Sequence, residues 1–245
     1  MWKLFVCALA LLANLPVTAY AAGEGGMHVE PIEIDMGDES MLQRGAKYFV
    51  NYCQSCHSAS YMRYSRLSED LQVPPELVEK NLIFTDQAIG ETMTSTMPAR
   101  DAAKWFGKAP PDLTLIARSR GVDWLYSYLK TFYLDESRPL GVNNLTYPDV
   151  GMPHVLGPLQ GWQKPVYERD GHGAQTISHL ELAEPGVLSP AEYDRLVRDL
   201  VTFLAYVGEP ALMSRAQVGT WVLLFLGVLL VLSYLLKREY WRDVH

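Results

Sequence analysis

The fold of this chain is organised around one short stretch, Cys53-Gln54-Ser55-Cys56-His57. Two thiols separated by two residues and followed directly by an imidazole form the attachment pattern for a c-type haem. The spacing has a chemical reason, because the two thiols add to the two vinyl groups on one edge of the porphyrin and the next residue can then bind the iron. The sequence therefore predicts one covalently bound haem c, attached through Cys53 and Cys56, with His57 as the proximal iron ligand.

Three other kinds of site also use two cysteines. A thioredoxin-like redox pair also uses two cysteines at this spacing, but it requires a βαβ setting that the flanking sequence does not show. A structural zinc site requires two further ligands at regular spacing, and no second cysteine pair is present. An exported protein with two cysteines can also carry one local disulfide. The directly following His57 favours haem attachment over all three.

The residues before this stretch predict a helix that delivers both cysteines to the protein interior. Asp38 or Ser40 can cap its start. An apolar stripe at helical spacing then leads to Cys53, and Gly45 leaves a notch where another helix can approach closely. The stripe consists of Leu42, Ala46, Phe49 or Val50, and Cys53.

Both ends of the chain carry apolar segments. Lys3, the apolar run 4–15 and Ala19-Tyr20-Ala21 form an export signal, so we expect residues 1–21 to be removed near Ala21. Residues 218–236, VGTWVLLFLGVLLVLSYLL, are 19 residues without a charge. At about 1.5 Å per residue they match a hydrocarbon core of about 30 Å, so we expect one transmembrane helix there.

Charge sets the expected orientation and excludes one class of partner. Arg215 precedes the apolar run, whereas Lys237, Arg238 and Arg242 follow it, which places the tail 237–245 in the cytoplasm. Residues 22–210 then form an exported haem domain, and 211–236 form the linker and the membrane helix. That domain holds 16 basic and 26 acidic residues, so nucleic acid is not an expected partner. Membrane lipid is an expected partner because of the apolar run at 218–236.

The sixth iron ligand has three candidates. Met97 lies in a polar stretch that solvent could cover. Met152 lies in a loop punctuated by Gly and Pro, which can project one side chain rigidly. His154 could form a bis-histidine pair with His57. The residue pattern alone favours Met152 only slightly.

A second long helix is predicted near the end of the exported domain. Ser189, Pro190 and Glu192 form a capping box with proline at the first helical position. An apolar stripe follows, and Gly208 and Pro210 end the helix. We expect this helix to pack on the one that carries Gly45. The predicted fold class is therefore mainly α: a cytochrome c-like haem domain with long irregular loops plus one C-terminal transmembrane helix.

With these features in this order, the chain resembles the cytochrome c1 family, the haem c subunit of the quinol–cytochrome c reductase or bc1 complex. The resemblance covers residues 30 to 243. Besides the haem motif it depends on ARDAA at 99–103, GKAPPDLTLIARSR at 107–120, and DVGMPHVL at 149–156. The simple export signal is similar to that of bacterial members, which implies a bacterial inner membrane with the haem domain in the periplasm.

The resemblance also implies roles for single residues and names partners. Met152 matches the family's axial methionine, Arg120 matches an arginine near a haem propionate, and Pro110 and Pro111 match a segment against the haem. The alternative role for Arg120 is a surface ion pair. The implied partners are cytochrome b, the Rieske iron–sulfur protein as electron donor and a soluble cytochrome c as acceptor.

The implied activity is that of the redox subunit of the reductase, with no independent turnover expected from this chain alone. The alternatives are a membrane-anchored haem c subunit of another respiratory complex and a tethered binding protein whose cysteines form a disulfide.

Overall fold

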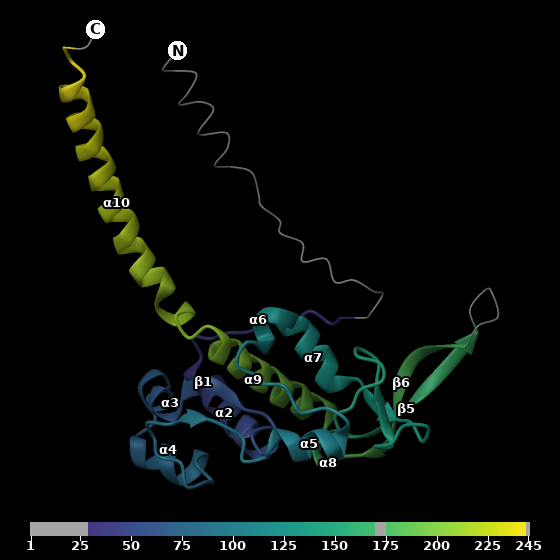
Figure 1. Ribbon diagram of the computed structural model, residues 1–245. Helices are drawn as coiled ribbons and strands as arrows, with labels where there is room; N and C mark the ends of the chain where they lie inside the picture. Colours follow the sequence, from purple (N-terminus) through teal and green to yellow (C-terminus); the bar gives the residue numbers. More distant parts are fainter. Residues whose placement is uncertain (1–28, 170–174, 244–245) are drawn as a thin grey trace.

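Two helices form the centre of the computed structural model, which describes residues 29–169 and 175–243 (Figure 1). They are α2 (Glu39–Tyr52) and α9 (Pro190–Gly208), and they pack along each other. The segment 1–21, expected to be an export signal, lies outside the described residues.

Helix α2 forms where the sequence predicts it. Asp38, not Ser40, is the N-cap, and its carboxylate accepts a hydrogen bond from the amide of Met41 at 3.1 Å. Every member of the predicted apolar stripe is buried, and both Phe49 and Val50 belong to it. The helix thus carries Cys53, which follows its last residue, into the interior.

The contact between α2 and α9 depends on Gly45. A Cβ at this position would lie 2.6 Å from the Cβ of Phe203 and closer still to the backbone oxygen of Asp199. Helix α9 begins with the predicted capping box, in which Ser189 and Glu192 bond to each other's backbone. The predicted packing of these two helices is therefore confirmed, and it sets the position of the haem motif relative to the core.

Short elements surround this pair. They include three two-stranded antiparallel sheets, β1–β2, β3–β4 and β5–β6. In chain order the elements between α2 and α9 are β1 (Ala59–Arg63), α3 (Tyr64–Asp70), α4 (Pro75–Leu82), β2 (Thr92–Met93), α5 (Ala99–Phe106), α6 (Ile116–Arg120), α7 (Val122–Lys130), β3 (Phe132–Leu134), β4 (Val142–Asn144), α8 (Gly157–Gln160), β5 (Gly161–Arg169) and β6 (Gln175–Pro185).

The hairpin of β5 and β6 lies in a stretch for which the sequence analysis predicted no strand. It projects from the helical body on the right of Figure 1. Two irregularities in its register, one after Trp162 and one after Val166, interrupt the alternation of residues between the two faces. Pro165 lies within β5, although proline has no N–H to donate to a neighbouring strand and so is rarely predicted inside one. Both features explain why the period-two pattern is weak in the sequence.

The C-terminal helix α10 (Leu212–Tyr240) extends away from the domain (Figure 1). Its segment Val218–Tyr240 has a mean hydropathy of 2.3, is not buried by the rest of the protein, and is long enough to cross a membrane. The helix begins earlier than expected, so the link to α9 is only Glu209, Pro210 and Ala211. Glu209 pairs with Arg118 at 3.4 Å and also with Arg215. The predicted fold class, mainly helical with a C-terminal apolar helix, is confirmed.

Candidate functional site

The haem-attachment motif forms a tight turn at the end of α2. The amide of Cys53 donates to Phe49 O at 2.8 Å, continuing the helical pattern for one residue. The amides of Cys56 and His57 then both donate to Cys53 O, at 3.1 and 2.8 Å. Cys53 is buried and Cys56 half-buried, and the two thiols are not bonded to each other. Both sulfurs and the imidazole are therefore presented by one compact turn.

The imidazole of His57 is oriented by Pro111. His57 Nδ1 lies 2.7 Å from the carbonyl oxygen of Pro111. A carbonyl can only accept, so Nδ1 carries the proton and Nε2 keeps a free lone pair. Burial lowers the pKa of His57, although the Pro111 bond and the charge of Asp112 oppose this. The ring is thus held neutral, with the nitrogen suited to an iron left available.

The segment that carries Pro111 is itself fixed to the residues after the motif. The backbone amide and the hydroxyl of Ser60 both donate to Asp112 Oδ2, at 3.0 and 2.6 Å. The amide of Leu113 donates to Ser58 O at 2.7 Å. Burial raises the pKa of Asp112, but the bonds from Ser60 and Thr114 outweigh it and leave the pKa below its ordinary value. The ionised carboxylate therefore secures the Pro110–Pro111 segment beside His57.

The electrostatics of Cys53 are opposite to those of a thioredoxin-like pair. Burial, together with the nearby Cys56, raises the pKa of the Cys53 thiol to about 12. Redox-active cysteines have a lowered pKa, because the thiolate is the nucleophile. The environment of Cys53 therefore counts against that alternative.

Met152 lies in the non-repetitive loop between β4 and α8, as expected. Its side chain packs on a small apolar cluster formed by Phe132, Val142 and Val150. The hydroxyl of Tyr128 donates to Met152 Sδ at 3.3 Å. A Cβ at the preceding Gly151 would lie 3.5 Å from the backbone oxygen of Phe106. The chain from Phe106 to Pro111 therefore runs from the Met152 loop to the His57 ring.

The other two candidates for the sixth ligand have different surroundings. The ring of His154 is buried, stacks on Phe132 with centroids 4.7 Å apart, and meets Trp162 edge-on. Burial lowers its pKa to about 4. Met97 is half-buried, and its amide donates to Ser95 Oγ at 3.1 Å. The ring of His154 is thus packed between two aromatic side chains. The Met97 segment lies beside the haem-attachment turn, because Ser95 Oγ donates a hydrogen bond to Ser55 O at 2.8 Å.

Arg120 is exposed at the end of α6. Its guanidinium lies over the ring of Trp124, 5.0 Å from the centroid, and 5.9 Å from the ring of Tyr147. Within residues 29–169 and 175–243 no ion pair to Arg120 is seen, in contrast to the alternative of a surface ion pair. Its planar group is therefore held over aromatic rings with its donors available for an anion.

The structure places Arg120 and Met152 at two ends of one aromatic cluster. Trp124 and Tyr128 stack with centroids 5.1 Å apart, and Tyr147 meets both rings edge-on. Trp124 and Tyr128 are residues that the sequence interpretation missed. Both lie on α7, and their spacing of four is a signal that could have found the pair, because residues four apart share one face of a helix.

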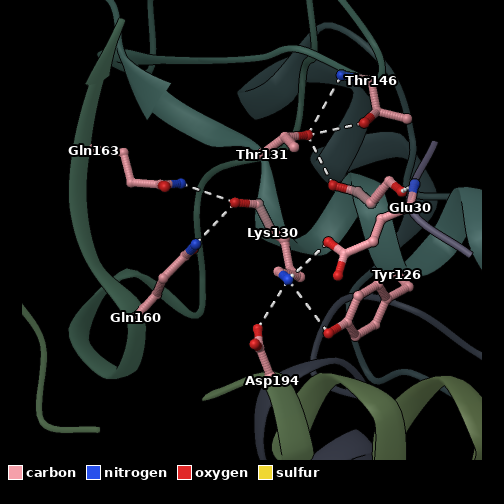
Figure 2. Close-up of polar contacts among 9 residues, drawn as sticks. Glu30, Tyr126, Lys130, Thr131, Thr146, Gln160, Gln163 and Asp194 are labelled. Carbon is pink, nitrogen blue, oxygen red and sulfur yellow. Dashed lines mark hydrogen bonds and ion pairs between the residues drawn. The ribbon is translucent and has the colours of Figure 1, made fainter. Parts of the chain in front are cut away.

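The last turn of α7 is fixed by side chains from other elements. Its final four carbonyl groups each accept a hydrogen bond, at 2.7 to 2.8 Å, from a side chain outside the helix. Figure 2 shows the bonds from Gln160 and Gln163 to the backbone of Lys130, whose ammonium also bonds to Glu30, Asp194 and Tyr126. The carbonyl of Ser127 accepts from Thr131, that of Tyr128 from Asn144, that of Leu129 from Tyr193, and that of Lys130 from Gln160 and Gln163. Such groups lack partners within a helix, so these bonds hold its end rigidly.

Comparison with known proteins gives a family match and full-length relatives. The Cytochrome C1 family matches residues 33–157 and 185–244, leaving out the part that contains the hairpin β5–β6. A cytochrome c1 of Allochromatium vinosum is 53% identical over 100% of both chains. A protein of Nitrosomonas europaea named ammonia monooxygenase gamma subunit is 46% identical over 98% of both. A cytochrome c1 of Rhodospirillum rubrum is 27% identical over 84% of this chain and 83% of its own.

Proposed function

This chain belongs to the cytochrome c1 family, and from that premise we propose that it is the electron-transfer subunit of a ubiquinol–cytochrome c oxidoreductase, the bc1 complex. It takes electrons from the Rieske iron–sulfur protein and passes them to a soluble cytochrome c, beside cytochrome b. The observation that carries the proposal is the turn at 53–57, in which His57 donates its Nδ1 proton to Pro111 O at 2.7 Å. This bond leaves Nε2 as an iron ligand.

The residues present fit a haem c. Cys53 and Cys56 have unbonded thiols that would form its two thioether links, and His57 and Met152 would supply a nitrogen and a sulfur to its iron. Such a group supplies an iron that alternates between two oxidation states and so carries single electrons. Arg120 is the proposed partner of a propionate, and Pro110 and Pro111 form the wall on the histidine side.

The environment of Met152 supports its assignment over His154. Its sulfur is held by Tyr128, whereas the ring of His154 is enclosed between Phe132 and Trp162. A thioether in place of a second imidazole raises the reduction potential, which suits transfer to a soluble cytochrome c.

The acidic domain and the apolar helix define the proposed setting. The excess of acidic over basic residues in 22–210 favours a basic soluble acceptor, because complementary charge speeds association. Residues 1–21 are the export signal, α10 is a single-pass anchor in membrane lipid, and 237–245 face the cytoplasm. The domain then lies in the periplasm at the inner membrane of a bacterium.

Purification of the full chain from native membranes tests the proposal. We expect covalent haem that survives denaturing electrophoresis, together with copurifying cytochrome b and Rieske protein. The double variant Cys53→Ala, Cys56→Ala should lose the covalent haem. Protein that comes out colourless from a host competent in cytochrome maturation, with thiols free or joined to each other, would refute the haem assignment. Copurification with oxidase subunits would instead indicate another respiratory complex.

A subunit of an ammonia monooxygenase is a second candidate, because a relative 46% identical carries that name. The two functions differ in activity: quinol-dependent reduction of soluble cytochrome c against ammonia-dependent oxygen uptake. An iron held by both His57 and Met152 would have no free position for oxygen, so the proposed ligand set favours the first.

The sixth ligand is tested by Met152→Leu, with Met97→Leu as the matched control. Met152→Leu should keep the haem attached but lower its reduction potential and let carbon monoxide bind the ferrous form. Met97→Leu should change neither property. The reverse result would assign the ligand to Met97.

A further inference from the structure

We propose that Tyr128 is a positioning residue for Met152, whose hydroxyl holds the thioether in place and raises the reduction potential of the bound haem. The inference rests on the proposed function, in which Met152 is the sixth ligand. Tyr128 itself does not touch the iron in this proposal and acts only through the sulfur.

The contact is a hydrogen bond from the hydroxyl of Tyr128 to Met152 Sδ at 3.3 Å. A thioether sulfur has two lone pairs, so it can accept this bond with one and donate the other to a metal. Methionine has three rotatable bonds and no strong orientational preference of its own. A fixed donor at the sulfur therefore selects one orientation of an otherwise adaptable side chain.

The ring of Tyr128 is enclosed on several sides. Trp124 stacks on it with an interplanar angle of 8°, and Phe132 and Tyr147 meet it edge-on with centroids at 5.2 and 6.5 Å. The ring therefore has little freedom to rotate away from Met152.

The backbone of Tyr128 is fixed as well. Its own carbonyl accepts a bond from Asn144 Nδ2 at 2.7 Å, and that of Leu129 accepts one from the buried Tyr193 hydroxyl at 2.8 Å. The Lys130 contacts in Figure 2 join the same turn to Glu30 and Asp194. Because both the ring and the backbone of Tyr128 are fixed, the flexible side chain of Met152 takes the orientation that the Tyr128 hydroxyl selects.

The bond also has an electronic effect. A donated hydrogen bond withdraws electron density from the sulfur, which weakens its donation to iron. The oxidised state depends more on that donation than the reduced state, so the bond favours the reduced state. One hydrogen bond shifts an equilibrium by about two- to tenfold. For a one-electron couple, a tenfold change corresponds to about 59 mV.

The test uses the full-length, haem-loaded protein with Tyr128→Phe, and Tyr126→Phe as the control. Tyr126 lies on the same helix and is buried, whereas Tyr128 is half-buried, and the hydroxyl of Tyr126 contacts Lys130 at 3.3 Å and not Met152. We expect Tyr128→Phe to keep its haem, to have a lower reduction potential in a redox titration, and to bind carbon monoxide more readily. Tyr126→Phe should match the wild type in both measurements.

Combination with Met152→Leu separates this inference from the proposed ligand. If the inference holds, Tyr128→Phe lowers the potential only when Met152 is present. If Met152→Leu opens the sixth position but Tyr128→Phe behaves like Tyr126→Phe, the inference is overturned while the ligand assignment stands. If Met152→Leu changes neither spectrum nor potential, both are overturned.

Discussion

Replacement of Gly45 by alanine tests the close packing of α2 on α9. The added methyl group would lie 2.6 Å from the Cβ of Phe203 and even nearer to the backbone oxygen of Asp199. Neither neighbour is the end of a flexible side chain, so the two helices must move apart. Overpacking of this kind costs about 1–3 kcal/mol, and a backbone obstacle points to the upper end of that range.

An opposing effect must be subtracted from this cost. Alanine is favoured over glycine inside a helix by about 1 kcal/mol. The net expected loss in the free energy of unfolding is therefore about 2 kcal/mol. For a chain of this size, the midpoint of thermal unfolding should fall by roughly 4–8 °C.

The assay is thermal unfolding of the full-length protein in detergent, followed by circular dichroism at one scan rate for all variants. Gly90→Ala is the control, because a Cβ at this exposed glycine would meet nothing within 4 Å. Its free energy of unfolding should stay within about 0.5 kcal/mol of the wild type. A Gly45→Ala protein as stable as the control, or more stable, would refute the close approach of the helices.

Three further outcomes are expected. Ser189→Ala should lower the free energy of unfolding by about 1 kcal/mol in chemical denaturation, through loss of the α9 cap. Lys130→Met should lower the free energy of unfolding by about 1–3 kcal/mol, because the carboxylates of Glu30 and Asp194 lose their cation. It should also speed proteolysis near Glu30, and unchanged cleavage would contradict the role of this lysine. The pKa of Asp112 is lowered in the folded protein, so its ionised carboxylate stabilises the fold at pH values above the ordinary pKa of an aspartate. This stabilisation is lost as the pH falls through the lowered pKa. Between about pH 5 and about pH 2 the wild type should therefore lose stability more steeply than Asp112→Asn, and parallel curves would contradict this.

The central helices could be predicted because their signals are local. A cap, an apolar stripe and a notch at Gly45 are all readable within one segment, and each is confirmed. The capping box at Ser189 is another local signal, and it places the start of α9 correctly.

The parts that could not be predicted depend on contacts between distant segments. The bond from His57 to Pro111 joins residues 54 positions apart, and only the resemblance to a family suggested that this proline segment mattered. Tyr128 and Met152 are 24 positions apart, and no pattern in either segment of the sequence predicts their hydrogen bond. The hairpin β5–β6 was missed because two register shifts and a proline obscure its alternation.

The three-residue link between α9 and α10 limits how the domain can swivel about its proposed membrane stalk. Fully extended, three residues reach only about 10 Å. Glu209 within the link also pairs with Arg118 of α6 and Arg215 of α10, which resists twisting. A long flexible tether would let the domain sweep a volume whose radius grows as roughly 5–6 Å times the square root of its length in residues. With this short tether, the proposed partners within the membrane would always meet the same face of the domain, so that only the proposed soluble acceptor would have to find it by diffusion.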